Sequence, residues 1–224
     1  MTHQHILKSV DDYYSHRLRE HGANSRGVDW NSDQSQMLRF RQLLQILDPS
    51  SSDASGDRSS PVTLLDYGCG YGALVTHLQA TAPHMRPIVY TGFDISDAMI
   101  TAARALHSGA GLQTSFTACR DDLTLADYVV ASGVLNVRGT IGVAEWESYV
   151  RDTLVDMNRL SRHGFAFNLL TSYSDPERMQ GNLYYGNPCE YFDFCKRNFS
   201  RQVALFHDYG LYEFTLLVRH APHV

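Results

Sequence analysis

The chain has 224 residues, of which 43% are hydrophobic and 19% are charged, and its formal net charge is -5. This length suits one domain with a buried core, and the acidic balance offers no positive field for phosphates, so we expect no nucleic-acid partner. The sequence has no signal-peptide core and no apolar run of bilayer length, which predicts a cytoplasmic protein without membrane contact. The cysteines and histidines lack metal-ligand spacing, so we expect no metal site, and the oligomeric state stays open.

The first part of the chain is predicted to be helical. Apolar residues recur at helical spacing over 6–21. They recur again in a second expected helix, which begins at Asn31 or Ser32 as its N-cap and extends to residue 47. We therefore expect residues 1–48 to form a helical leader. Residues 49–61 are polar and rich in serine, which predicts a flexible connector.

From residue 62 onward, short apolar strands alternate with amphipathic helices, and this alternation is typical of an α/β fold with a mostly parallel sheet and helices on both faces. Two further strands, 202–207 and 212–219, are joined by a turn too short for a parallel crossover, so they are expected to form an antiparallel hairpin. The other expected strands are 62–66, 87–93, 112–118, 127–131 and 164–170, and the expected helices are 73–81, 97–107 and 144–162.

A glycine-rich turn follows the first strand of this region, where the sequence reads Leu-Leu-Asp-Tyr-Gly-Cys-Gly-Tyr-Gly-Ala. Glycines at 68, 70 and 72 allow a tight turn and let a ligand lie against the bare backbone. Asp66 stands at the carboxyl end of the strand, where its carboxylate would repel a pyrophosphate and suit a cationic ligand. Because residues 68–73 also fit the dinucleotide pattern G-x-G-x-x-G/A, an NAD(P)-dependent oxidoreductase remains an alternative.

The pattern Asp-x-Gly-x-Gly-x-Gly resembles the first cofactor motif of the class I S-adenosylmethionine-dependent methyltransferases, and the element order extends this resemblance over about residues 62–219. The resemblance, to the bacterial stand-alone small-molecule type, implies a Rossmann-like seven-stranded sheet and S-adenosylmethionine, which carries an ammonium and a sulfonium and no phosphate. It implies methyl transfer to a small-molecule acceptor, with oxygen or nitrogen favoured. Such an in-line displacement needs alignment rather than a dedicated nucleophile. A non-catalytic cofactor-binding subunit is a further alternative.

Further residues for the cofactor follow the later strands. Asp94 comes 22 residues after Gly72, where a carboxylate can accept both ribose hydroxyls, and Ile95 can cover the adenine ring. The resemblance implies an acid after the third strand that accepts from the adenine amino group, Asp121 or its neighbour, and backbone contacts after the fourth strand. The full expected set is Asp66, Tyr67, Gly68, Cys69, Gly70, Gly72, Asp94, Ile95, Asp121, Asp122, Ser132, Gly133 and, from the leader, Arg39.

Two segments are expected to supply the residues that bind the methyl acceptor. Residues of about 171–198 form an insertion rich in tyrosine, glycine and asparagine, and loops on a rigid sheet often carry binding residues. The resemblance implies that the leader, residues 1–48, folds over the cofactor site, where Gln36 is a further candidate beside Arg39 to reach the methionine carboxylate or the acceptor. Asn136 either orients the acceptor or holds its loop. The expected acceptor residues are Trp30, Asn136, Tyr173, Tyr184 and Tyr185, and the catalytic candidates are Asn136, Tyr185 and His207.

Overall fold

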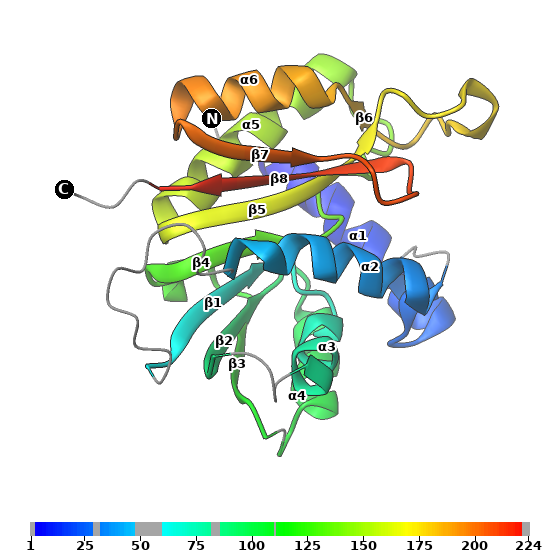
Figure 1. The fold of residues 1–224 in the computed structure, drawn as a ribbon. Coiled ribbons are helices and arrows are strands. Elements are labelled where there is room, and N and C mark those ends of the chain that lie inside the picture. The colour runs from blue at the N-terminus through cyan, green and yellow to red at the C-terminus, as the bar shows by residue number, and fades with distance from the viewer. Residues whose placement is uncertain (1–2, 29–31, 48–59, 82–85, 110, 221–224) are drawn as a thin grey trace.

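The computed structural model describes residues 3–28, 32–47, 60–81, 86–109 and 111–220 (Figure 1). Trp30 and nearly all of the expected connector lie outside the described residues, so their assignments stay predictions. Within the described part of the chain, no helix combines the length and the hydropathy needed to cross a bilayer.

One sheet organises the described residues, with strands in the order β3-β2-β1-β4-β5-β8-β7 and the short β6 paired to β5 outside this path. The neighbours from β3 to β5 pair in parallel, whereas β8 pairs antiparallel with both β5 and β7. The predicted mostly parallel sheet and its terminal hairpin are therefore confirmed. The strands are β1 (Val62–Tyr67), β2 (Ile88–Phe93), β3 (Gln113–Thr117), β4 (Ala126–Ala131), β5 (Ser161–Thr171), β6 (Tyr185–Gly186), β7 (Gln202–Phe206) and β8 (Glu213–Arg219).

The helices begin where the sequence offers caps. Ser32 caps the second helix by accepting the Ser35 N–H, and Ser96 caps the fourth by accepting the Met99 N–H. Ser32 thus fills the role that the sequence had left open between Asn31 and Ser32. The α-helices are α1 (Gln4–His21), α2 (Asp33–Leu44), α3 (Ala73–Thr81), α4 (Asp97–Leu106), α5 (Val143–Leu160) and α6 (Pro188–Asn198), and short 3-10 turns are η1 (Ser25–Val28), η2 (Gln45–Leu47), η5 (Arg120–Asp122) and η6 (Pro176–Arg178).

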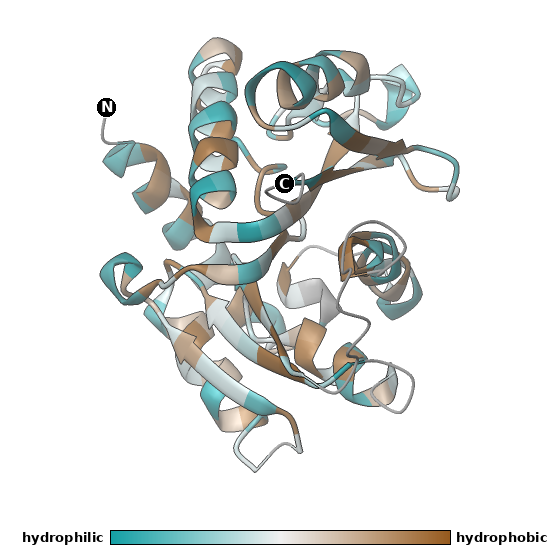
Figure 2. Ribbon diagram, turned by 60° about the vertical axis from the view of Figure 1, so that its left-hand side comes forward, coloured by the Kyte–Doolittle hydropathy of each residue, from teal (hydrophilic) through white to brown (hydrophobic). Residues whose placement is uncertain are grey.

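Alternate strand residues face two separate hydrophobic cores. Leu65 packs into the core under α5 and α6, while its neighbour Leu64 packs into the core under α2 and α3. This follows from the two-residue period of a strand. Figure 2 shows hydrophobic residues along the strands and alternating hydrophilic and hydrophobic bands on the helices. Both faces of the parallel sheet are covered, as such a sheet requires.

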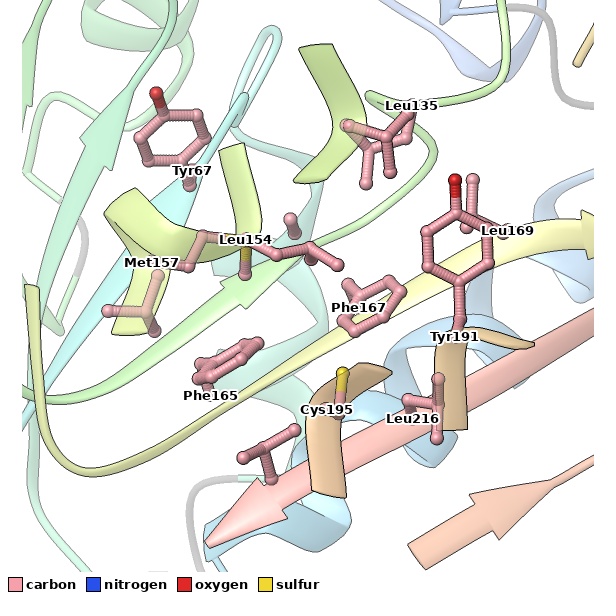
Figure 3. Close-up of a cluster of buried hydrophobic side chains, with 14 of the residues drawn as sticks. Tyr67, Leu135, Leu154, Met157, Phe165, Phe167, Leu169, Tyr191, Cys195 and Leu216 are labelled. Atoms are coloured by element: carbon pink, nitrogen blue, oxygen red, sulfur yellow. The ribbon is translucent and has the colours of Figure 1, made fainter. Parts of the chain in front are cut away.

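The larger core lies between β5 and helices α5 and α6 (Figure 3). Leu154 and Met157 of α5 and Cys195 of α6 pack with Phe165 and Phe167 of β5, all five with no exposed surface. Truncating a phenylalanine in such a site costs about 3–5 kcal/mol of stability. This core holds β4 and β5 rigid, and the cavity described below opens at the end of β4.

Helix α6 departs from the sequence expectation, which placed its residues in an acceptor-binding insertion. Asn187 caps α6 by accepting the N–H groups of Cys189 and Glu190, and Pro188 occupies the first turn. The buried side chains Tyr191 and Cys195 then turn one face of the helix into the core. The Asn-Pro pair was the available signal for this helix start. Because α6 is a packing element, only the stretch before it remains a loop insertion.

Candidate functional site

A cavity opens at the carboxyl ends of β1, β2 and β4, with about 890 Å³ of empty space including the part open to solvent. The chain runs outward from β1 through β2 to β3 and then returns to place β4 on the other side of β1. This reversal leaves a crevice between the β1 and β4 loops, which is where open α/β sheets bind ligands.

The glycine turn forms the floor of the cavity. The N–H groups of Gly68 and Cys69 both donate to the carbonyl of Phe93, at 2.7 and 2.9 Å, and join the turn to the end of β2. A Cβ on Gly68 would stand 2.0 Å from Val134 Cγ1, and the φ of +82° at this residue also favours glycine. Gly70, with φ +54°, is different because the nearest atom to its Cβ position is Val28 Cγ1 at 3.4 Å. Gly70 therefore offers bare backbone to a ligand.

Asp94 lines the cavity and ties its two adjoining loops together. Its Oδ2 accepts the Gly70 N–H at 2.9 Å and its Oδ1 accepts the Ser96 N–H at 3.0 Å. Burial raises the pKa of Asp94 to about 6, although these two N–H groups oppose the rise. Each carboxylate oxygen has a second acceptor position, so the group is able to bind ligand hydroxyls as well.

Asp66 lies at the bottom of the cavity and is 3% exposed. The Tyr90 hydroxyl donates to its Oδ2 at 2.7 Å. Burial raises the pKa of Asp66 to about 7, against the lowering effect of the Tyr90 hydrogen bond and with a further rise from the charge of Asp94. Two carboxyl groups in one cavity thus change charge close to neutral pH, which is typical of functional sites.

The leader covers this cavity, with Asp11 and Tyr14 of α1 and Gln36 of α2 among its lining residues. Ser15 Oγ donates to Asp11 Oδ1 at 2.9 Å and lies 2.8 Å from the hydroxyl of Ser96, so α1 is joined to the start of α4. Gln36 was expected from the sequence. Asp11 and Tyr14 were missed because their pattern signals only an amphipathic helix, and nothing local shows which core its face meets.

The loop after β4 supplies another wall through Ser132, Gly133 and Val134. Among the described residues, the Ser132 hydroxyl is buried without a hydrogen-bond partner. Gly133 donates its N–H to Asn168 Oδ1 at 2.8 Å, and its carbonyl accepts the N–H of Asn136 at 3.4 Å. Since both backbone groups of Gly133 have protein partners, Ser132 carries the polar group that is left for a ligand.

Other residues expected at the cofactor do not line the cavity. Asp121 is exposed in η5, and the carboxylate of Asp122 accepts the Thr117 hydroxyl at 2.6 Å. Arg39 is buried, but its guanidinium forms an ion pair with Glu213 instead of reaching the cavity. By contrast, the lining does include expected residues from the first, second and fourth strand ends, namely Asp66, Tyr67, Gly68, Cys69, Gly70, Asp94, Ile95, Ser132 and Gly133.

Gly72 is also absent from the lining, and it contributes through packing. A Cβ there would stand 2.8 Å from the His107 ring, and φ is +82°. Burial lowers the pKa of His107, whose ring stacks on Phe116. Gly72 thus lets the turn pack closely on the end of α4.

Of the residues expected at the acceptor, those that the structure describes lie away from the cavity. Asn136 Oδ1 accepts the Leu170 N–H at 3.1 Å, so this side chain holds its loop. The hydroxyl of Tyr184 lies 2.8 Å from that of Tyr191 in the core, which leaves it no access to the cavity. The remaining three are elsewhere on the insertion and hairpin: Tyr185, whose hydroxyl accepts the Gln180 N–H, and the ring pair Tyr173 and His207.

The charge of the lining decides which ligand it fits. Among the described lining residues there are three carboxylates, Asp11, Asp66 and Asp94, and no lysine, arginine or histidine. Such a set disfavours a pyrophosphate and favours a ligand with positive charges, because a buried charge needs a partner of opposite sign. The unpartnered Ser132 hydroxyl and the open backbone at Gly70 also fit a bound polar molecule. Fold and site together define a class: a Rossmann-like protein whose cavity suits a cationic ligand without phosphates.

Comparison with known proteins agrees with this class. A family described as a methyltransferase domain matches residues 65–162. A protein of Mycobacterium tuberculosis named "Putative methyltransferase Rv1506c" is 48% identical over 163 residues, which are 73% of this chain and 96% of that protein. The chain belongs to the class I S-adenosylmethionine-dependent methyltransferases, and S-adenosylmethionine is its cofactor.

Two solved structures share the fold. Magnesium protoporphyrin IX methyltransferase from Synechocystis PCC 6803 with bound S-adenosylmethionine has a TM-score of 0.61 at 17% identity, covering 96% of this chain and 97% of that one. Phosphoethanolamine N-methyltransferase 1 of Haemonchus contortus, in complex with phosphoethanolamine and S-adenosylhomocysteine, has a TM-score of 0.59 at 12% identity, covering 100% of this chain and 51% of that one. At these identities the comparison shows the fold alone.

Proposed function

We propose that the protein transfers the methyl group of S-adenosylmethionine to oxygen or nitrogen of a small-molecule acceptor in the cytoplasm. The observation that carries the proposal is the composition of the cavity wall. Leader helices α1 and α2 line it together with the strand ends, and its described lining has no cationic side chain to hold a nucleic-acid backbone. Two of the proteins with this fold, those described above, are named for a porphyrin and for phosphoethanolamine, which agrees with a small acceptor. Four free cysteines support a reducing compartment.

S-adenosylmethionine supplies an electrophilic methyl group on a sulfonium. Asp66, Asp94 and Ser132 line the cavity. In this proposal Asp66 and Asp94 would hold the cationic and hydroxyl groups of the cofactor, and Ser132 would bind either ligand. The leader then excludes water from the reacting atoms. An oxygen or nitrogen acceptor brings its own lone pair, so alignment is the main contribution of the protein. An acceptor that had to lose a proton first would depend on a cavity carboxylate, since the described lining has no histidine or lysine.

The acceptor class can be tested without knowing the acceptor. Methyl-labelled S-adenosylmethionine and the protein are added to an extract of the cells that make it, and the label is followed after ultrafiltration. We expect enzyme-dependent label in the small-molecule fraction, with none above background in RNA or protein. The Gly70→Arg variant provides the matched control for label transfer by other enzymes. Label retained with RNA or protein would contradict the proposal, and cofactor binding without any transfer would favour a non-catalytic subunit.

A further inference from the structure

A buried polar chain connects helix α2 to the cavity wall. Arg39 of α2 donates from Nε to both oxygens of Glu213 on β8, each at 2.7 Å. Asn168 of β5 donates from Nδ2 to Glu213 Oε2 at 2.7 Å and accepts the Gly133 N–H on its Oδ1 at 2.8 Å. The exposures of Arg39, Glu213 and Asn168 are 6%, 1% and 1%. We call these three side chains with Gly133 the Arg39 relay.

Stability alone gives a poor account of the Arg39 relay. Removing two charges from water costs several kcal/mol per ion, and replacing a buried ion pair by apolar residues is often neutral or stabilising. Asn168 also interrupts a strand whose neighbours Phe167 and Leu169 are fully buried hydrophobic residues. Asn168 shares a face of β5 with Ala166, which packs into the core under α2 and α3, so a leucine-like residue would suit that core better. What the polar groups add is a defined orientation of the side chains, because each donor of the Arg39 relay must face an acceptor.

The direction of the Arg39 relay ends at the cavity. Glu213 accepts only, so it turns the amide nitrogen of Asn168 toward itself and leaves the amide oxygen facing Gly133. Gly133 has φ +77°, a conformation that L side chains rarely adopt, and the residues on both sides of it line the cavity. The hydrogen bond from Gly133 to Asn168 therefore sets where Ser132 and Val134 stand.

We propose that Arg39, Glu213 and Asn168 are positioning residues for methyl transfer: they hold Gly133 and thereby the Ser132–Val134 wall against the reacting groups. Arg39 acts through Glu213, and Glu213 through Asn168, without contact with either ligand. This inference rests on the methyltransferase activity and is independent of the nature of the acceptor. A displacement of the wall by 1 Å is enough to lower a rate by about 100-fold.

The first test replaces the ion pair by apolar residues in an Arg39→Met, Glu213→Leu double variant. We expect a folded variant whose unfolding midpoint is near or somewhat below that of the wild type, because the apolar pair is close to neutral while Asn168 Nδ2 loses its acceptor. We also expect S-adenosylhomocysteine affinity within about 3-fold and label transfer into cell extract lowered about 10-fold to 100-fold. Exchange of the Gly133 N–H, followed by NMR, should accelerate. The control is Arg197→Gln with Asp193→Asn, an exposed ion pair on α6. A folded double variant with unchanged transfer, or with unchanged Gly133 exchange, overturns the proposal.

The second test, Asn168→Asp, distinguishes positioning from packing and also serves if the double variant does not fold. The new carboxylate still accepts the Gly133 N–H but repels Glu213 unless one proton is shared between them. Arg39, which pairs with Glu213, and Tyr209, whose pKa the charge of Glu213 raises, are charged or titratable groups near it. We expect label transfer of this variant, relative to the wild type at each pH, to recover as the pH falls. A ratio that does not change with pH overturns the proposal, as does a ratio of one throughout.

If the wild type labels only macromolecules, the small-molecule proposal fails while both tests still apply.

Discussion

A Gly70→Arg variant is expected to bind S-adenosylhomocysteine at least about 100-fold more weakly than the wild type, a loss of about 2.7 kcal/mol, while it keeps its fold. The space in front of Gly70 is open, with Val28 Cγ1 at 3.4 Å as the nearest atom to the position a Cβ would take, so the new side chain enters the cavity. Its guanidinium would pair with the cavity carboxylates and take the place of the cationic cofactor. The backbone cost of an L residue at φ +54° is about 1–2 kcal/mol. Calorimetric titration and thermal unfolding measure the two effects separately.

Two matched variants separate loss of binding from loss of fold. Gly70→Ala bears the same backbone cost without filling the cavity, so we expect only a small loss of affinity. Gly68→Ala places a Cβ 2.0 Å from Val134 Cγ1, and we expect it to lower the unfolding midpoint more than either change at Gly70. Binding by Gly70→Arg at near wild-type affinity would show that the cofactor does not lie over this turn.

An Asp66→Asn variant should be more stable than the wild type at pH 8 and bind S-adenosylhomocysteine more weakly. The folded-state pKa of Asp66, about 7, is above its ordinary value of 3.8. The contribution of Asp66 to the free energy of unfolding is therefore most favourable below about pH 3.8 and declines as the pH rises to about 7. Asparagine carries no charge, keeps an acceptor for the Tyr90 hydroxyl and avoids this decline. The difference has an upper limit on the order of 4 kcal/mol.

Urea unfolding at pH 4 and pH 8 provides the check. We expect the stabilities of the variant and the wild type to be similar at pH 4 and to separate at pH 8 in favour of the variant, whereas ligand affinity at pH 8 drops about 10-fold or more. Tyr90→Phe serves as a control, because it removes the hydrogen bond that lowers the pKa of Asp66 and keeps the carboxyl. An equal stability difference at both pH values would show that Asp66 ionises normally in the folded protein. The stability of the protein would then be unrelated to the charge that Asp66 offers the cofactor.

Prediction from the sequence was successful where the signal is local. The glycine turn, Asp66 and Asp94 line one cavity because strand ends in a parallel sheet meet at one edge. Helix α6 was missed, although Asn187 and Pro188 mark its start, because the tyrosine, glycine and asparagine residues around it suggested a loop. The expected acceptor residues that the structure describes do not line the cavity, for a related reason. A buried tyrosine such as Tyr184 and a ligand-binding one share the same local pattern, and only its partner Tyr191 tells them apart.

By itself, the sequence determined the class of fold, and it predicted the turn that we propose for the cofactor and the preference of that turn for a cation over a phosphate. These depend on strand and helix periods and on residues close together in the chain. Only the tertiary structure decided that Asp11 and Tyr14 of α1 line the cavity and that Arg39 pairs with Glu213, 174 residues away, instead of lining it. The physical reason is that a buried charged side chain pairs with an oppositely charged group that the fold brings close to it. Those surroundings come from packing between distant segments, which no local pattern records.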